Sequence, residues 1–263
     1  MKNIGIIVGY GFDFKSGGQK EICSSLRKKG YSVKEVAEAW PRDKYVLSND
    51  KYIPAGESGS AGNVFGEGGN IQKGNGFVLI SDNAFYYDNI KSKIDFNKLR
   101  ADKKYYNLAK EVILKEGKKH YSERIHVAPT GDFHGQLAQG HIDLFTMLLP
   151  NNKILIFDKH FGKDANLDKD YNIIAEQEKL KFIEYDGSQD NVWYPLNSLI
   201  LPSENKEVVV IDSKAKSLQK LLNMKGIETI AVDMPQKNYP AGKLNCQTNI
   251  FNLGDEKKVR GFF

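Results

Sequence analysis

The sequence is poor in cysteine, in long apolar runs and in clustered charge of one sign. Cys23 and Cys246 are the two cysteines among 263 residues. That is too few for the disulfide framework of a small secreted protein, and it predicts a reduced protein of the cytoplasm. The apolar run over residues 4–9 is too short to cross a bilayer and lacks the longer apolar core and cleavage site of a signal peptide. It predicts a first strand, and no membrane is expected among the partners.

The lysines and arginines do not gather into a stripe that could bind nucleic acid. They number 38 against 33 aspartates and glutamates, a net charge of +5, but the two signs are interleaved, as at Asp102–Lys104. A nucleic-acid surface needs basic residues gathered on one face, so no nucleic-acid partner is expected. Hydrophobic residues make up 40% and charged residues 27% of the chain, as in ordinary globular proteins. We expect one domain over residues 1–263 with a substantial core.

A unit of supersecondary structure recurs along the chain: an apolar strand, an amphipathic helix that ends near Lys-Gly or a lysine cluster, and a β-branched strand. The clearest copy has a strand at 207–211, a helix at Ala215–Met224 and a strand at 227–232. The other three copies place strands at 4–8 and 31–36, 77–80 and 124–127, and 153–157 and 182–185, with helices at 18–29, 105–116 and 171–179. Strands that alternate with helices predict parallel βαβ units and the α/β class.

Two features distinguish this pattern from an ordinary doubly wound sheet. Gly74–Gly76 is a hairpin signal, and it pairs the strand at 77–80 with residues 70–72 in antiparallel fashion. Polar motifs also fall before or between the copies, as if each copy contributes one loop to a shared centre. The Gly/Ser-rich segment 54–63 is interpreted as a mobile loop within the domain because these motifs lie on both sides of it. The stretch at 192–196 has no assigned element.

Cys246 is a candidate nucleophile because it lies between a loop at 240–243 and a short strand at 249–251, where a thiol can face a pocket. Cys23 lies within a helix and is interpreted as a small buried hydrophobe. A cysteine becomes nucleophilic at neutral pH with help from a base or a nearby positive charge. Packing in the core stays the alternative interpretation of Cys246.

His141 and Asp143 are a candidate proton shuttle and carboxylate. They lie on a predicted strand, where period-two alternation points both side chains to the same face. An exposed strand face explains the same pair without any function. His134 is a nearby competitor. His134 and His141 with Asp132 or Asp143 suggest a metal site, but no third ligand has regular spacing. We therefore expect no metal and no cofactor.

Glu67-Gly68-Gly69-Asn70 is a third polar motif. No predicted helix follows it, so it does not fit a nucleotide-binding glycine loop. Its glycines let the backbone approach a ligand closely while Glu67 projects into the site. A plain turn is the alternative.

Trp40-Pro41-Arg42-Asp43 combines a large ring, a rigid bend and opposite charges. An aromatic face next to a carboxylate suits a planar cation, through stacking and paired hydrogen bonds. A surface ion pair between Arg42 and Asp43 is the commoner outcome for two such neighbours.

Taken together and in this order, the four motifs resemble those of the guanidino-group-modifying enzymes of the pentein superfamily. The closest likeness is to agmatine deiminases and bacterial-type peptidylarginine deiminases, and it extends over residues 39–249. The family patterns Trp-x-Arg-Asp, Glu-Gly-Gly, Gly-His-x-Asp and a Cys-x-Thr-Gln-like segment match residues 40–43, 67–69, 140–143 and 246–249.

The resemblance implies a pentein-type α/β propeller of five ββαβ units with pseudo-five-fold symmetry around a central active-site channel. It also implies hydrolysis of a guanidinium group through a covalent cysteine amidino-thio intermediate, with release of ammonia and a ureido product. Cys246 would be the nucleophile, His141 the proton shuttle and Glu67 the catalytic acidic residue. Five residues would contact the substrate: Asp43, Asp143, Trp40, Arg42 and Asn70.

The chain departs from the family pattern in ways that leave the rest of the substrate open. Lys44-Tyr45 stands where members typically have Gly-Pro, and Asn245 stands where histidine is common. A small-molecule guanidino compound is the expected partner, with Arg42, Lys44 and Lys243 as candidates for contacting an α-carboxylate. The alternatives are an amidinotransferase or a dimethylarginine-type hydrolase on the same scaffold, and a non-catalytic binding module. A homodimer is left open.

Overall fold

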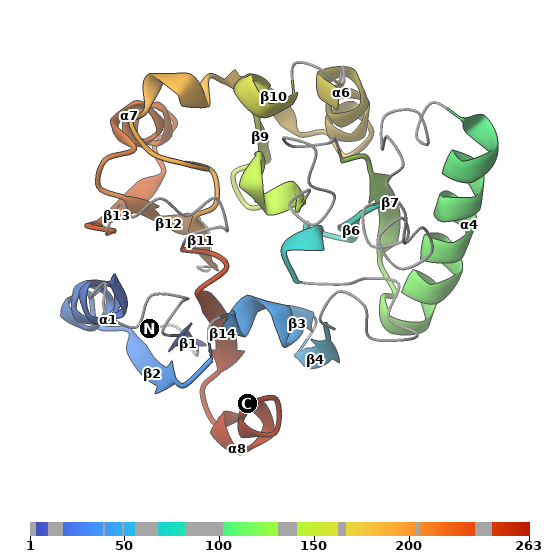
Figure 1. The fold of residues 1–263 in the computed structure, drawn as a ribbon. Helices are drawn as coiled ribbons and strands as arrows, with labels where there is room; N and C mark the ends of the chain where they lie inside the picture. The colour runs from blue at the N-terminus through green and yellow to red at the C-terminus, as the bar shows by residue number, and fades with distance from the viewer. Residues whose placement is uncertain are drawn as a thin grey trace.

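The computed structural model describes residues 4–9, 18–38, 40–48, 50–55, 68–82, 102–130, 141–162, 167–202, 206–234 and 244–263. These residues form five small sheets that stay separate and do not join into one closed barrel (Figure 1). Four sheets have three strands and the fifth has two. The expectation of an α/β fold is confirmed.

The four three-stranded sheets share one order of elements, strand, strand, helix and strand. They comprise β5 (Ile71–Lys73), β6 (Phe77–Ser81), α4 (Lys103–His120) and β7 (Arg124–Ala128); β8 (Thr146–Leu149), β9 (Ile154–Asp158), α5 (Lys159–Gly162), α6 (Leu167–Gln177) and β10 (Lys181–Tyr185); β11 (Leu199–Pro202), β12 (Glu207–Asp212), α7 (Lys216–Met224) and β13 (Glu228–Val232); and β14 (Thr248–Asn252), β1 (Ile4–Gly9), α1 (Gly18–Lys28) and β2 (Ser32–Val36).

In each of these sheets the middle strand pairs antiparallel with the first strand and parallel with the third. The four parallel pairs are the four predicted βαβ copies, so that prediction is confirmed. The hairpin predicted at Gly74–Gly76 is confirmed as well, because it joins β5 to β6. In the last sheet, β14 comes from the C-terminal end of the chain and β1 from the N-terminal end.

The fifth sheet has β3 (Tyr45–Ser48) and β4 (Lys51–Pro54) in antiparallel pairing. In the part of the chain that the structure describes, it has no third strand and no helix of its own. Symmetry of five complete ββαβ units therefore stays a prediction.

The core consists of apolar clusters that each pack one sheet against the next. One cluster joins β3 and β4 to β5 and β6, the next joins β6 to β9 and α6, and a third joins β8 and β9 to β12 and α7. A fourth joins β12 and β13 to β1 and α1, and a fifth joins β1 and β14 back to β3. Every residue of β6, β9 and β12 is buried, because sheets and helices cover both faces of these strands.

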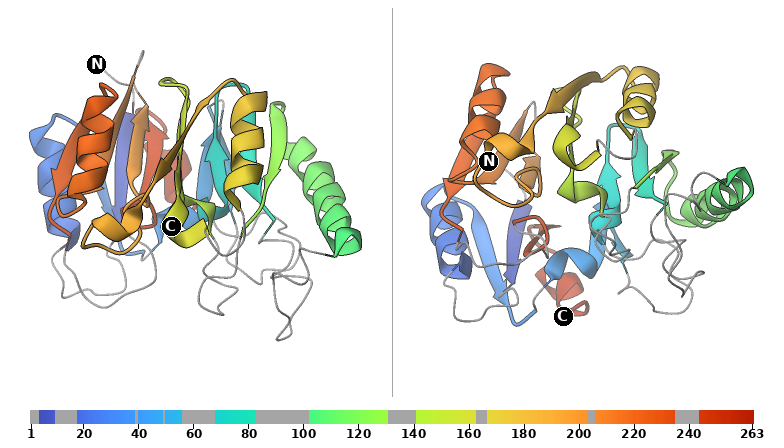
Figure 2. Two further views of the ribbon diagram at one scale, coloured as in Figure 1. Left: turned by 90° about the horizontal axis from the view of Figure 1, so that it is seen from above. Right: turned by 45° about the horizontal axis from the view of Figure 1, so that its top comes forward.

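The sheets therefore follow one another in a circuit, with α1, α7, α6 and α4 on its outer side (Figure 1). In the left view of Figure 2, turned by 90° from Figure 1, the strands stand next to one another at similar heights. The first strands, β3, β5, β8, β11 and β14, all contribute residues to the walls of one cavity. The residues that precede these strands are thus brought toward one region.

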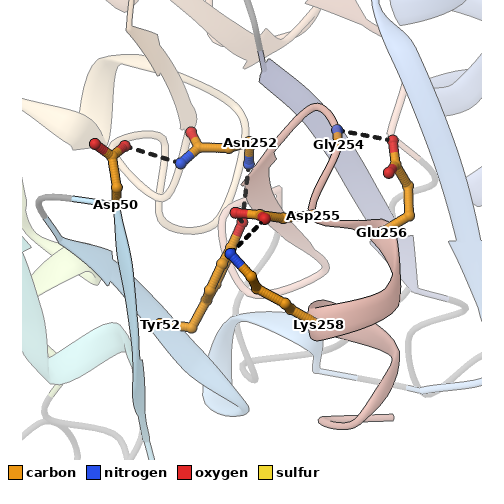
Figure 3. A network of polar contacts seen from close by, with 7 residues as sticks. All are labelled: Asp50, Tyr52, Asn252, Gly254, Asp255, Glu256 and Lys258. Atoms are coloured by element: carbon orange, nitrogen blue, oxygen red, sulfur yellow. Dashed lines mark hydrogen bonds and ion pairs between the residues drawn. The ribbon is translucent and has the colours of Figure 1, made fainter.

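A polar network fastens the two-stranded sheet to the C-terminal segment that carries α8 (Glu256–Arg260) (Figure 3). The Tyr52 hydroxyl donates to Asp255 Oδ2 at 3.1 Å and accepts from the Asn252 backbone N–H at 3.0 Å. Asn252 Nδ2 donates to Asp50 Oδ1 at 2.9 Å, and Lys258 forms an ion pair with Asp255 at 2.6 Å. These contacts link β4 to β14 across 200 residues of sequence.

One element differs from its prediction. The residues after His141 do not form a strand but a 3-10 turn, η4 (Ile142–Leu144), and the strand begins later, at Thr146. Three residues are too few for periodicity to separate a turn from a strand. Among the described helices, none is long and apolar enough to cross a membrane.

Candidate active site

Short turns that precede the first strands carry the polar motifs. They are η1 (Pro41–Asp43) before β3, η2 (Gly68–Asn70) before β5, η4 before β8, and the turn at 244–247 before β14. η2 contacts both η1 and η4, and η1 contacts β14. The expectation that the motifs meet at a shared centre is confirmed for their described residues.

η1 starts with a proline, whose fixed φ suits the first position of a helical turn. The Asp43 N–H donates to Trp40 O at 3.0 Å and closes the turn. Asn249, a buried residue of β14, donates to Pro41 O at 3.0 Å and to Tyr45 O at 2.9 Å. η1 is therefore fixed to the strand that follows the candidate nucleophile, and the side chains of Trp40 and Asp43 are half-buried.

Arg42 points inward rather than lying along the surface. Its Nη2 donates to Ile71 O at 2.8 Å, and its charge acts on the buried groups of Asp143 and Tyr45. It lies within the centre of the candidate site, which argues against the interpretation of Arg42 and Asp43 as an ordinary surface pair.

The two glycines of η2 are needed for close approach. A Cβ at Gly68 would lie 2.0 Å from Arg42 O, and a Cβ at Gly69 would lie 2.5 Å from His141 Nδ1 and 2.9 Å from Asp143 Oδ1. Real Cβ atoms do not approach so closely, so a residue larger than glycine cannot fit without moving its neighbours. Gly69 thus forms the surface on which the imidazole and the carboxylate meet.

η4 places His141 and Asp143, but not through strand alternation as predicted. The Thr146 hydroxyl donates to Ile142 O at 2.6 Å across the turn. Gln72 Nε2 donates to Thr146 O at 3.0 Å and to Thr146 Oγ1 at 2.9 Å. These bonds tie η4 to β5, so both side chains reach Gly69 although no strand carries them.

The carboxylate of Asp143 is the most deeply buried charge of the candidate site, with 3% of the residue exposed. Its Oδ2 accepts from Asn245 Nδ2 at 2.7 Å, and its Oδ1 has no donor among the described residues. Burial raises the pKa of Asp143, although the neighbouring His141, Asn245, Arg42 and Asn197 all favour its charged form. The neighbouring residues therefore do not fully offset the cost of burying the charged Asp143 carboxylate.

Asn70 lies at the other end of η2 and is 3% exposed. Its Oδ1 likewise has no donor within the described part of the chain. Buried acceptors in folded proteins are normally paired, so the Oδ1 atoms of Asn70 and Asp143 are two acceptors that the described residues leave unpaired.

Cys246 lies in the turn at 244–247, with 7% of the residue exposed. The Thr248 hydroxyl donates to Leu244 O at 2.6 Å and the Thr248 N–H donates to Asn245 O at 3.3 Å, which closes the turn. Asn245, next to the thiol, is the residue that binds Asp143. The residue next to the candidate nucleophile therefore binds the candidate cation-binding carboxylate.

Cys23 confirms its assignment as a core residue. It lies on α1 in the cluster with β1 and β12 and is 2% exposed. Burial raises the pKa of its thiol to about 11, so it carries no thiolate at neutral pH.

Some predicted residues cannot be placed. Glu67, His134 with Asp132, Gly140, Lys243 and most of the segment 54–63 lie outside the described residues. The role of Glu67 therefore stays a prediction. Among the described residues, no group of three or more His, Cys, Asp and Glu side chains could hold a metal ion.

Tyr194 and Asn197 belong to the candidate site but were not predicted from the sequence. Asn197 Oδ1 accepts from the Cys246 N–H at 3.5 Å. Burial raises the pKa of Tyr194, and the charge of Cys246 raises it further, so the ring lies near the thiol. The sequence offers one weak indication of this turn, the segment Pro195–Asn197, which ends two residues before β11 begins at Leu199.

A cavity of about 510 Å³ extends along the first strands of the five sheets. Arg42, Asp143 and Asn245 line part of it, whereas His141 and Cys246 do not. Asp143 therefore borders both this cavity and the imidazole.

No protein-family model and no curated protein matches the chain, but solved structures match its fold. Agmatine deiminase of Enterococcus faecalis matches with a TM-score of 0.61 and 13% identity, over 94% of this chain and 93% of its own. A DDAH, or dimethylarginine dimethylaminohydrolase, from Pseudomonas aeruginosa in complex with citrulline matches with a TM-score of 0.59 and 11% identity, over 94% and 98%. An arginine dihydrolase from cyanobacteria matches with a TM-score of 0.58 and 10% identity, over 95% of this chain and 39% of its own.

The chain has the pentein fold. Identities of 10–13% establish the fold alone. Within this fold, the turns before β3, β5, β8 and β14 lie together, through contacts of η2 with η1 and η4 and through the hydrogen bonds of Asn245 with Asp143 and of Asn249 with Pro41.

Proposed function

We propose that this chain is a guanidino-group hydrolase, a deiminase that acts on an arginine-like or agmatine-like substrate through Cys246. The reaction releases ammonia and a ureido product. The fold, shared with enzymes whose names include agmatine deiminase and arginine dihydrolase, supports this chemistry as a class.

The observation that carries the proposal is the environment of Asp143. Its carboxylate is buried beside the imidazole of His141 and accepts a hydrogen bond from Asn245, the residue that precedes Cys246. Its Oδ1 has no hydrogen-bond partner among the described residues. Burying a charged group is costly unless a partner compensates it. A guanidinium supplies both a positive charge and several N–H donors in one plane, so it suits this position.

In the first half of the proposed reaction, Asp143 and Asp43 hold the guanidinium and the Cys246 thiolate attacks its central carbon. A C–S bond forms, the bond from that carbon to one nitrogen breaks, and His141 gives a proton to the nitrogen, which leaves as ammonia. The bound cation supplies the positive charge that favours the thiolate. Trp40 offers an aromatic face, and Arg42 and Asn70 line the surroundings.

In the second half, water replaces the departed ammonia. His141 takes a proton from the water as it attacks the amidino carbon, and the C–S bond then breaks to restore the Cys246 thiolate. The proton left on the hydroxyl group is released to solvent, which gives the neutral ureido product. Glu67, next to Gly68, would contact the substrate nitrogens and orient His141, as the family resemblance implies. The proposal includes no metal and no cofactor.

The test is a panel of guanidino compounds that includes agmatine, arginine, Nω,Nω-dimethylarginine and an arginine peptide, assayed for ammonia or amine release and for the ureido product. We expect at least one compound to yield a ureido product with the wild type and none with Cys246→Ser or His141→Ala. Dimethylamine release would assign the dimethylarginine-type reaction, and a new guanidino compound formed from an added amine would assign amidino transfer. Undiminished turnover by Cys246→Ser would contradict the proposal.

A further inference from the structure

Some functional residues in the turns that precede the first strands share an offset from the strand, although Asp143 lies one residue earlier, three residues before β8. Asp43 and Cys246 each lie two residues before the first residue of the strand that follows, β3 and β14. Trp40 and His141 are each the last residue before their turn, and the carbonyl oxygen of each accepts the backbone N–H three residues later, at 3.0 and 3.2 Å. Each of these two positions therefore occurs in two of the turns.

The fifth first strand, β11, has the same arrangement in front of it. Asn197 lies two residues before Leu199, the first residue of β11, and its N–H donates to Tyr194 O at 3.0 Å, three residues back. By this offset Tyr194 occupies the position of Trp40 and His141, and Asn197 occupies the position of Asp43 and Cys246. The motifs described above assign no function to this turn.

The turn before β11 is well fixed. The Ser198 hydroxyl donates to Pro195 O at 2.9 Å, and the Ser198 N–H donates to Leu196 O at 2.7 Å. Tyr194 is 1% exposed and has a φ of 48°. Left-handed backbone is uncommon for an aromatic residue, and such conformations persist where the surroundings enforce them, often at functional sites.

Asn197 contacts the nucleophile turn at two successive N–H groups. Its side-chain Oδ1 accepts from the Cys246 N–H at 3.5 Å, and its backbone O accepts from the Asn245 N–H at 3.4 Å. Because Oδ1 faces the Cys246 N–H, the amide nitrogen is the side-chain atom left to face other groups. The Asn197 side chain also favours the charged form of the Asp143 carboxylate, although, among the described residues, no hydrogen bond of ordinary geometry joins its amide nitrogen to Asp143 Oδ1.

Asn245 completes a closed set of contacts. Its side chain binds Asp143 Oδ2 at 2.7 Å while its backbone binds Asn197. The nucleophile turn is therefore held on both sides, by Asp143 through Asn245 and by the turn before β11 through Asn197.

We propose that Asn197 is a positioning residue of the active site, which holds the Cys246 backbone with its side-chain oxygen and faces the Asp143 carboxylate with its amide nitrogen. It keeps the thiol and the cation-binding carboxylate at a fixed separation. The inference rests on the proposed function for the meaning of that separation. Asn197 does not touch the reacting atoms, so its effect acts through Cys246 and Asp143.

The experiment compares Asn197→Ala and Asn197→Asp in a Cys23→Ala background, which leaves Cys246 as the single thiol. The pH dependence of alkylation of Cys246 by iodoacetamide is measured without substrate, and kcat and KM are measured with the best compound of the guanidino panel. Asn191→Ala is the matched control, because Asn191 is exposed and lies in the same segment. Thermal unfolding of each variant shows whether it is folded.

We expect Asn197→Ala to lower kcat about 10- to 100-fold with KM changed by less than about twofold, because misplacement of a reacting group by roughly 1 Å has effects of this size. Asn197→Asp is nearly isosteric and keeps the acceptor for the Cys246 N–H, so it should fold, but it adds a negative charge near the thiol. The midpoint of the alkylation profile should then move to higher pH, because a like charge disfavours the thiolate. Asn191→Ala should leave both measurements unchanged.

An alkylation profile of Asn197→Asp that coincides with that of its parent would overturn the inference. A fall in the kcat of Asn197→Ala that is fully explained by the fraction of unfolded protein would overturn it as well. The alkylation measurement needs no substrate, so it stands even if the parent turns over no guanidino compound, an outcome that would contradict the proposed function alone. If Asn197→Ala does not fold, the profile of Asn197→Asp decides.

Discussion

Replacement of Gly69 by alanine would put a methyl group into the space that the His141 imidazole occupies. The added Cβ would lie 2.5 Å from His141 Nδ1 and 2.9 Å from Asp143 Oδ1. Ordinary van der Waals contact begins at 3.4 Å, so the ring must move by 3.4 − 2.5 = 0.9 Å, and the carboxylate oxygen by 3.4 − 2.9 = 0.5 Å. The φ of Gly69 lies outside the left-handed range, so alanine fits the backbone and the effect is steric.

A displacement of this size at a group that transfers a proton should reduce kcat by about 100-fold. We expect the kcat of Gly69→Ala to fall about 100-fold on the guanidino compound that the wild type turns over. The variant should stay folded, so the loss of rate is not explained by a loss of folded protein. The assay is ammonia release under saturating substrate, together with circular dichroism of the folded protein. Gly261→Ala is the control, because a Cβ at Gly261 meets only Lys258 O, at 3.5 Å. Wild-type kcat in folded Gly69→Ala would refute the placement of His141 against Gly69.

Two further predictions concern stability. Burial raises the pKa of Asp143 above its value in the unfolded chain, so the folded state binds more protons and this group lowers stability as pH rises above about 4, the ordinary pKa of an aspartate. Asp143→Asn should abolish ammonia release yet raise the free energy of unfolding near neutral pH by about 1–3 kcal/mol. Melting temperatures equal to those of the wild type at every pH above about 4 would contradict the argument. Tyr52→Phe removes the acceptor of the Asn252 N–H and the donor to Asp255, so the free energy of unfolding should fall by about 1–2 kcal/mol, or a few degrees of melting temperature. The control is Tyr106→Phe, the same change on α4, outside the network in Figure 3. A calorimetric melting temperature of Tyr52→Phe no lower than that of the control would show that the network contributes nothing.

The sequence predicted the four βαβ units because each has a long apolar strand and a helix of several turns, which are the elements that periodicity identifies best. The hairpin between β5 and β6 was predictable because Gly74–Gly76 is a strong local turn signal. The meeting of the polar motifs followed from their regular position before the repeated units. These features depend on local patterns that one sequence displays.

The remaining features depend on contacts between distant residues. The 3-10 turn at Ile142–Leu144 is stabilised by Thr146 and, through it, by Gln72, 74 residues away. Arg42 points inward because a backbone carbonyl at Ile71 accepts its hydrogen bond. The pattern of side chains in the sequence does not indicate that a backbone carbonyl will accept this hydrogen bond.

Asn197 shows the same limitation for the candidate site. A neutral residue in a Pro-Leu-Asn turn matches no catalytic motif, and its importance becomes visible when the turn before β11 is compared with the turns before β3, β8 and β14. Asn245, noted from the sequence as a departure from the family pattern, is seen in the structure to bind Asp143.

The central claim, a covalent reaction of Cys246 with a guanidinium carbon, is tested most directly by trapping the intermediate. The enzyme is mixed with the compound that it turns over, quenched in acid within one turnover, digested and analysed by peptide mass spectrometry. We predict an adduct of the substrate minus ammonia on the peptide that contains Cys246, absent from Cys246→Ser and absent from the peptide that contains Cys23. Turnover at the wild-type rate without any adduct, and with activity retained in Cys246→Ser, would contradict the account.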